Sequence, residues 1–175
     1  NCTNDALTTG VWYGIYNNAA SANNLNINSN TFTGNTSKAT SGATYLIYNN
    51  GAVPGTININ NNNLSHTFNN TAAYTGATYS LYNSNGTTTT TLNITGNNFS
   101  NYTFTNVTGS GSLYFIYQTN SNANLNITGN TWTNLTLNHS ASEYCCYNNS
   151  STQVALTFNN NSIVTGYTRT AACGT

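Results

Sequence analysis

The apolar and polar positions of this 175-residue chain follow one pattern that recurs five times. In its clearest copy, Leu125 to Trp132, apolar residues occupy positions 1, 3 and 8 and an asparagine occupies position 6. The copies begin at residues 25, 57, 92, 125 and 156, which are 32, 35, 33 and 31 residues apart. Alternation with period two predicts a strand with one face inward, and a repeat of this length is typical of solenoids.

A second, aromatic module lies between successive copies. It carries a tyrosine at each end and mostly apolar residues between them, at 13–16, 45–48, 79–82, 114–117 and 144–147. With two strands from the first module and one from the second, each repeat is expected to form a three-strand coil. The sequence has no apolar stripe of period 3.6, and Asn, Thr and Gly are poor helix formers, so no helix is expected.

These elements predict an all-β fold, a parallel β-helix (β-solenoid) of about five three-strand coils, as a single domain 1–175 with partial repeats at 1–16 and 154–175. Stacking places equivalent residues above one another, so the inward apolar positions form continuous columns. The position-6 asparagines form a further column at a corner, where each amide can bond to its neighbours above and below: Asn30, Asn62, Asn97, Asn130 and Asn161.

Charged residues are nearly absent, with two Lys/Arg and two Asp/Glu and a net charge of zero. No basic stripe can follow a phosphate backbone, so nucleic acid is not an expected partner. The apolar runs are too short to span a bilayer, so no membrane insertion is expected. Polar, weakly charged tracts also fit a disordered chain, but the thirteen tyrosines follow the repeat instead of being scattered.

The chain begins with Asn1 and contains no methionine, which predicts a processed, exported form. Fifteen Asn-X-Ser/Thr sequons support this, although an Asn- and Thr-rich chain contains many by chance. We therefore expect an extracellular or cell-surface glycoprotein. The glycosylation candidates are Asn35, Asn69, Asn85, Asn106, Asn134, Asn138 and Asn148.

The Leu-Asn-Ile-Thr-Gly-Asn-Thr-Trp segment at 125–132 and its copies resemble the repeats of right-handed parallel β-helix proteins of the pectin-lyase-like class, over about residues 25–168. The resemblance implies the fold and leaves the activity open, because the class includes polysaccharide lyases and hydrolases, phage tailspikes, adhesins and surface-layer proteins. Its enzymes use clustered acidic and basic residues in a cleft. This sequence has no such cluster.

Catalysis and metal binding are not expected. Asp5 and Glu143 are the only carboxylates and belong to opposite ends of the expected stack, so neither has a partner for acid–base chemistry. His66 and His139 lie in different repeats, without cysteine or carboxylate at metal-ligand spacing, and are expected to be structural or merely exposed. We therefore expect no enzyme activity, no metal and no cofactor.

The four cysteines, Cys2, Cys145, Cys146 and Cys173, are disulfide candidates. Cys2 and Cys173 are expected at opposite ends of the stack, roughly 20 Å apart, whereas a disulfide needs Cα atoms within about 7 Å. Cys145 and Cys146 are adjacent on a strand, which predicts Cys146 inward and Cys145 outward. A bond from Cys173 to either one is the plausible intrachain link, and free buried thiols are the alternative.

The two ends of the chain are expected to complete one interrupted repeat, since 154–168 supply two strands and 9–16 supply the third. The terminal turns are also expected to lack the polar or charged caps that keep solenoids apart. The leading hypothesis is a secreted structural subunit that stacks head to tail on itself into an extracellular filament or surface appendage, reinforced by disulfides.

Two alternatives remain. The chain could be one segment of a longer surface adhesin or stalk. It could also be an ice- or glycan-binding β-solenoid, through Thr-x-Thr segments such as Thr31–Thr33 and Thr131–Thr133, or through exposed tyrosines that contact glycans.

Overall fold

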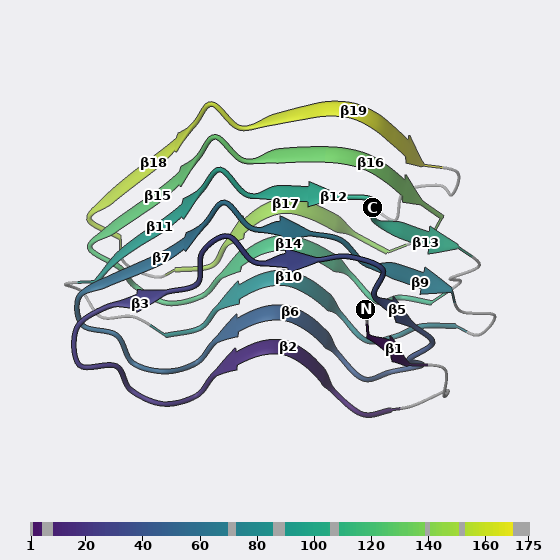
Figure 1. Cartoon of the computed structure of the whole chain (residues 1–175), viewed down its shortest axis with the longest axis horizontal. Coiled ribbons are helices and arrows are strands. Elements are labelled where there is room, and N and C mark those ends of the chain that lie inside the picture. Colours follow the sequence, from purple (N-terminus) through teal and green to yellow (C-terminus); the bar gives the residue numbers. More distant parts are fainter. Residues whose placement is uncertain are drawn as a thin grey trace.

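The computed structural model describes residues 2–4, 9–69, 73–85, 90–105, 109–138, 141–150 and 153–169. Over these residues the chain forms an all-β parallel solenoid of about four turns, with no helix (Figure 1). The predicted fold class is confirmed. The count of about five coils was slightly high, because the first and last coils are incomplete.

Three sheets run along the solenoid, and every strand pair of the described part is parallel. Each coil passes through sheet C, then sheet A, then sheet B. Sheet C holds β3 (Leu25–Asn26), β7 (Thr56–Asn60), β11 (Thr91–Thr95), β15 (Asn124–Thr128) and β18 (Ala155–Asn159). Sheet B holds β2 (Trp12–Asn17), β6 (Thr44–Asn49), β10 (Thr78–Asn83), β14 (Leu113–Gln118) and β17 (Glu143–Asn148).

Sheet A is longer and has two halves. Its first half holds β4 (Thr31–Phe32), β8 (Asn63–Leu64) and β12 (Asn98–Ser100), and its second half holds β1 (Thr3–Asn4), β5 (Thr36–Ser37), β9 (Thr67–Asn69) and β13 (Thr103–Thr105). In the last two coils the halves merge into β16 (Thr131–Leu137) and β19 (Ser162–Arg169).

The second half of sheet A corrects the sequence-based prediction. The expected three-strand coil assigned no strand to residues 34–44, but Thr36–Ser37 form a strand that pairs with β9. The same segment in later coils places Phe68, Phe104 and Leu137 in the core. The earlier coils therefore contain one strand more than the three expected, and in the last two coils the same segment is the second part of β16 or β19.

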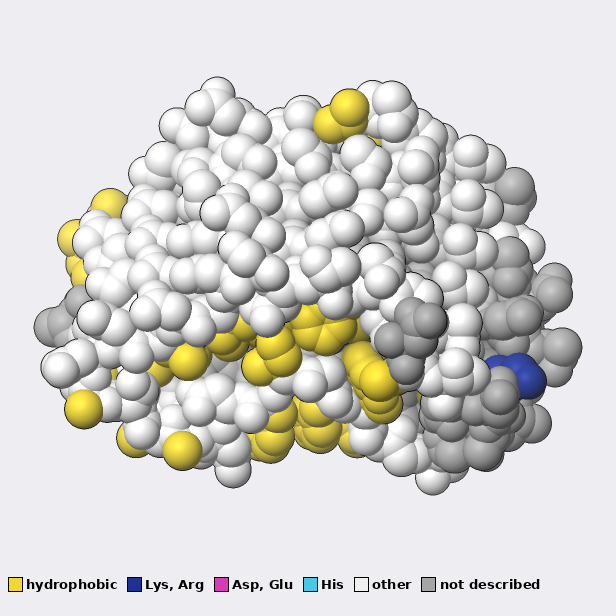
Figure 2. All heavy atoms as spheres, in the orientation of Figure 1, with side chains coloured by type: hydrophobic (Ala, Val, Ile, Leu, Met, Phe, Trp, Pro, Cys, Tyr) yellow, Lys and Arg dark blue, Asp and Glu magenta, His cyan; other side chains and the backbone are white. Residues whose placement is uncertain are grey.

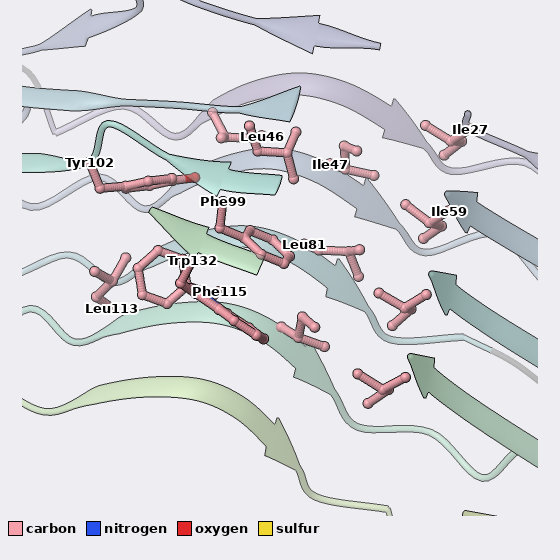
Figure 3. Packing of buried hydrophobic residues seen from close by; sticks show 14 of the residues in the cluster. Ile27, Leu46, Ile47, Ile59, Leu81, Phe99, Tyr102, Leu113, Phe115 and Trp132 are labelled. Atoms are coloured by element: carbon pink, nitrogen blue, oxygen red, sulfur yellow. The ribbon is translucent and has the colours of Figure 1, made fainter. Parts of the chain in front are cut away.

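The predicted inward columns are confirmed by the register of the sheets. Leu25, Ile57, Leu92, Leu125 and Leu156 form one column, and Phe32, Leu64, Phe99, Trp132 and Ile163 form another. Ile15, Ile47, Leu81, Ile116 and Cys146 form the third. Figure 3 shows this stacking at the next inward position of sheet C, where Ile27, directly after β3, and Ile59 of β7 lie one above the other.

The strands of sheet B bend at their centre. In β6, Leu46 and Ile47 are both fully buried, although they are adjacent, while Tyr45 and Tyr48 both stay on the outer side. The strand therefore departs from simple alternation, which would place neighbours on opposite faces. The bend puts two tyrosines per coil on the same outer face.

Candidate functional site: the ladders and the two end coils

The corner between sheets C and A carries a continuous asparagine ladder. The Oδ1 atom of Asn97 accepts hydrogen bonds from the backbone N–H and the Nδ2 of Asn62, at 3.0 and 2.9 Å. Asn97 in turn donates its own N–H and Nδ2 to Oδ1 of Asn130, at 2.9 and 3.0 Å, and Nδ2 also donates to the carbonyl of Ile59 at 2.8 Å. Hydrogen bonds of this kind join all five predicted asparagines.

A residue with positive φ precedes each ladder asparagine and makes the corner sharp. These residues are Ser29, Asn61, Gly96, Gly129 and Asn160, with φ between 54° and 65°. Glycine adopts this left-handed conformation without strain, and asparagine tolerates it better than most residues. The local sequence therefore turns the chain so that the next amide points along the solenoid axis.

Two further amide ladders were missed by the sequence analysis. In sheet C, each Nδ2 of Asn58, Asn93 and Asn126 donates to Oδ1 of the asparagine one coil below, at 2.8 Å in each case. At the end of sheet B, Asn17, Asn49, Asn83 and Gln118 are joined by side-chain hydrogen bonds of 2.7 Å. Their signal in the sequence is an amide residue at the same position of successive repeats.

Among the described residues, the corner ladder ends in an unused hydrogen-bond acceptor in the first coil and an unused donor in the last coil. In the first coil, Oδ1 of Asn30 accepts no hydrogen bond from a described residue. In the last coil, Nδ2 of Asn161 donates to the carbonyl of Ile127 at 2.8 Å, but Asn161 has no described asparagine above it to receive its N–H. The first coil thus presents an acceptor and the last coil a donor.

The outer face of sheet B carries two columns of tyrosines. The first is Tyr13, Tyr45, Tyr79, Tyr114 and Tyr144, in which successive rings are nearly parallel with centroids 4.8 to 5.1 Å apart. The second is Tyr16, Tyr48, Tyr82, Tyr117 and Tyr147, in which the orientation changes once, between Tyr82 and Tyr117, at 80°. We call these ten residues the tyrosine ladder.

Packing within the tyrosine ladder changes the acidity of its phenols. Burial, and then the neighbouring phenols Tyr13, Tyr48 and Tyr82, raise the pKa of Tyr45 to about 12. The pKa of Tyr79 is also raised, first by burial and then by Tyr45 and its other neighbours. Tyr45 and Tyr79 therefore stay neutral at physiological pH and add no charge that would repel along the stack.

Ring stacking also limits what the tyrosine ladder can bind. A glycan that stacks on an aromatic ring needs an open ring face, but where successive rings of the ladder are parallel, as in Tyr45–Tyr79 and Tyr48–Tyr82, the ring of the next coil covers that face. At the first coil, Tyr13 and Tyr16 are the most exposed, at 39% and 43%. The ladder is therefore most open at its end, where another aromatic ring would continue it.

The last coil exposes apolar side chains at inward positions. Leu156, Phe158 and Ile163 continue buried columns, yet they are 55%, 51% and 55% exposed because no described coil covers them. A hollow of about 190 Å³ is lined by Phe158 and Ile163 together with Trp132 and Cys145. Within the described part of the chain, this end of the core is uncovered.

The first coil is similarly open. Trp12, Ile15, Leu25 and Phe32 are only partly buried against the core. Figure 2 shows a band of hydrophobic side chains across the lower part of the molecule, where Figure 1 shows β2 below and β3 above. Few charged side chains are visible among the described residues in this view, and most of the described side chains beside the band are neutral and polar.

One pair of charges corrects the prediction that the terminal turns lack charged caps. Nη1 of Arg169 lies 2.6 Å from Oε1 of Glu143, and both side chains are largely buried. The hydroxyl of Tyr167 donates to Oε2 of Glu143 at 2.6 Å, and Nη2 of Arg169 donates to the carbonyl of Ala141 at 3.2 Å. This cluster covers part of the last coil and leaves the apolar part open.

The cysteines form no disulfide among the described residues. Cys2 is exposed and free, and Cys145 and Cys146 are free and half-buried. Cys145 was predicted to face outward, but it packs against the core beside Cys146, because sheet B strands turn both central residues inward. Burial raises the pKa of the Cys146 thiol to about 11. Cys173 and its predicted bond lie outside the described residues.

The glycosylation candidates differ in accessibility. Asn35 is 4% exposed, and Oδ1 accepts the N–H of Cys2, so a glycan cannot be accommodated there in this fold. Asn134 and Asn148 are exposed, and Asn85 and Asn138 are half-buried. The side chain of Asn69 and the whole of Asn106 lie outside the described part of the chain.

His66 is buried in the second coil, between Trp12 and Phe68, with ring centroids 5.8 and 4.5 Å away. His139 and Asp5 lie outside the described residues. In the part of the chain that the structure describes, no three His, Cys, Asp or Glu side chains group as a metal site would require. That part also contains no helix long and apolar enough to cross a membrane.

The predicted Thr-x-Thr surface lies in sheet A. Thr31 pairs with Asn63, and Asn98 pairs with both Asn63 and Thr131. Threonine is therefore interrupted by asparagine along this column. A continuous threonine face is absent here.

Comparison with protein-family models, curated proteins and solved structures gave no match to this chain. The parallel β-solenoid is therefore established by its own strand register and not by similarity.

Proposed function

We propose that this chain is a structural subunit that stacks head to tail on copies of itself into an extracellular filament or surface appendage. The observation that carries the proposal is the complementarity of the two end coils. One end presents the acceptor Oδ1 of Asn30 and the other presents the donors of Asn161. The chemistry is that of a self-templating surface and not of a catalytic centre.

Continued register supports this pairing. If a second copy continues the stack, Leu25 lies on Leu156, Phe32 lies on Ile163, and Ile15 lies on Cys146, as within the chain. Tyr13 then stacks on Tyr144 and extends the tyrosine ladder. Each contact removes apolar surface from water at about 25 cal/mol per Å², and the unpaired strand edges gain main-chain hydrogen bonds.

The interface is heterologous, because the surface at one end differs from the surface at the other. Such an interface does not close on itself, so repetition produces a fibre. Export, N-glycosylation at Asn134 or Asn148, and disulfide reinforcement through Cys2 or Cys173 remain parts of the proposal. The pectin-lyase-like relationship also remains a proposal that rests on the repeat pattern.

The longer stalk or adhesin is the competing proposal, since further coils of one polypeptide would cover the same end surfaces. Ice binding has less support because the threonine column is interrupted. Ring-face glycan binding has less support because the ladder covers its own rings.

A substitution at Gly10 tests assembly without disturbing the subunit. A Cβ at Gly42, Gly76 or Gly111 would lie 1.8 to 2.6 Å from a glycine carbonyl of the coil below, whereas one at Gly10 meets nothing within 4 Å. In the stack, Gly10 takes the place above Ala141 of the preceding copy. Gly10→Val should keep the circular dichroism and thermal midpoint of the wild type but lose filaments in negative-stain microscopy.

The matched control is Ser41→Val, at an exposed position of the same corner one coil further on. It should form filaments like the wild type. Abundant filaments from Gly10→Val would contradict the proposed packing. A wild-type chain that stays monomeric at all concentrations would reject assembly and favour the stalk.

A further inference from the structure

A junction between two stacked copies contains one strand segment too many. In sheet B, β2 of the next copy follows β17, and in sheet C β3 follows β18. In the second half of sheet A, however, the end of β19 lies on β16 with Thr168 on Thr136, while β1 of the next copy lies under β5 with Thr3 on Thr36. Both segments occupy the same layer, so one of them must leave when the copies stack in register.

β1 is the weaker of the two. It pairs with β5 at two positions only, Thr3 with Thr36 and Asn4 with Ser37. Two more hydrogen bonds, both 3.0 Å, join Cys2 to Asn35 and Thr36. Cys2 and Thr3 are exposed. Short, exposed strand pairs open at low free-energy cost.

β19 is held more firmly. It pairs with β16 at six positions, from Ser162 to Arg169. Its end is tied to β17 by the ion pair of Arg169 with Glu143 and by the hydrogen bond of Tyr167 to the same carboxylate. Displacing β19 would break this ion pair and hydrogen bond, whereas displacing β1 breaks, among the described residues, only backbone pairs and one side-chain hydrogen bond.

The edge of β5 that β1 covers also contains an unmet polar group. Asn35 is 4% exposed, and its Nδ2 has no hydrogen-bond partner among the described residues. The strand register puts Thr168 and Thr36 in one column of the sheet. The residues that precede them, Tyr167 and Asn35, therefore also share a column. An incoming β19 therefore offers both a strand edge and a phenol to this buried amide.

We propose that β1 is a temporary cover for the edge of β5, and that the Tyr167–Arg169 segment of the preceding copy replaces it during assembly. The inference rests on the proposed head-to-tail stacking. The β5 edge is then occupied by a second copy of this chain, whose β19 pairs with β5 as a parallel strand.

Pairs of introduced cysteines distinguish the two arrangements. In a chain with Ser at all four native cysteine positions, Thr168→Cys with Thr36→Cys should cross-link neighbouring copies, because adjacent parallel strands place paired Cα atoms about 5 Å apart. Without exchange, β1 lies between them and separates them by roughly 10 Å, which is too far for a disulfide. Thr168→Cys with Thr3→Cys would then cross-link instead.

A third pair reports stacking alone. Thr157→Cys on β18 and Asn26→Cys on β3 lie on the outer face of sheet C and become neighbours in any in-register stack. If β1 is exchanged, this pair and the Thr168–Thr36 pair should both give covalent multimers on non-reducing gels. The Thr168–Thr3 pair should then give at least about tenfold less covalent multimer. The reverse preference for Thr3 overturns exchange and keeps stacking, whereas no multimers from any pair overturns both.

A locked variant provides a second measurement. Thr3→Cys with Thr36→Cys in the same serine background should form an intrachain disulfide that holds β1 on β5. The oxidised protein should lose filament growth, and reductant should restore it. Wild-type growth of the oxidised protein would overturn the inference.

Discussion

His66 shows at the residue scale how completely this solenoid excludes water. The imidazole is 2% exposed, and neither ring nitrogen has a hydrogen-bond partner among the described residues. Burial lowers the pKa of His66 to about 3. The ring is therefore neutral in the folded chain over most of the pH range.

This burial predicts acid sensitivity. Above pH 6.5, the ordinary value, His66 is neutral in both the folded and the unfolded state, so the full stability is present. Between pH 6.5 and about 3 only the unfolded state takes up the proton. The free energy of unfolding should therefore fall by about 1.4 kcal/mol per pH unit over that window.

Urea unfolding at a series of pH values measures this slope. His66→Leu places an apolar side chain between Trp12 and Phe68. This variant should lose most of the pH dependence of the free energy of unfolding. Since the chain has only two carboxylates, few other groups contribute. An equal slope in His66→Leu would assign the acid sensitivity to another group.

Single positions also show where sequence reasoning failed. Asn35 is an acceptable sequon by sequence, but it is buried because β1 and the second half of sheet A enclose it. Cys145 was placed outward by simple alternation, which fails at the bend of sheet B. Neither error could be corrected from the residue itself, since both depend on neighbours far away in the sequence.

At the scale of elements, the corner asparagine ladder fixes how sheet C meets sheet A. Each amide receives two hydrogen bonds from the coil below and donates to the coil above, so one residue joins three coils. Asn97 is completely buried. Its loss would leave the backbone N–H of Asn62 without its acceptor and would remove one of the two acceptors of the Asn62 Nδ2.

We expect Asn97→Ala to lower the free energy of unfolding by about 3–5 kcal/mol, because each buried polar group left unpaired costs about 1–3 kcal/mol. Asn93→Ala is the matched control, since Asn93 lies on the neighbouring strand with a half-buried side chain in the outer ladder. The control should lose about 1 kcal/mol or less. Equal losses in denaturant unfolding would show that the corner has no special role.

The sequence pattern predicted the strands of sheets C and B and the first half of sheet A, because their apolar residues recur at fixed spacing. It missed the second half of sheet A. There the inward residues change from Ser37 to Phe68, Phe104 and Leu137, and the connections before them differ in length. The sequence does contain a signal for this strand, a short alternation of apolar and polar residues such as Leu135-Thr136-Leu137. The expected three-strand coil did not assign it to any strand.

At the scale of the whole molecule, the near absence of charge has a consequence for assembly. The described end coils carry one ion pair, Glu143 with Arg169, whose partners lie on the same chain. Contacts between copies would then consist of apolar packing and of hydrogen bonds between neutral groups. Salt screens only charges, so it should have little effect on these contacts.

We expect the critical concentration for filament formation to change less than about twofold between about 0.05 M and about 1 M NaCl. Ammonium sulfate should lower it, since excluded salts strengthen apolar burial. Sedimentation of filaments at several salt concentrations measures both effects. A critical concentration that rises steeply with NaCl would indicate ionic contacts between copies.

The sequence by itself determined the repeat, the inward columns and the corner asparagines, because a solenoid repeats local chemistry and each period shows it again. Only the tertiary structure decided the bend of sheet B, the burial of Asn35 and the pairing of Glu143 with Arg169. These features depend on which coil lies above or below a residue, and that is set by packing between segments roughly a full repeat apart.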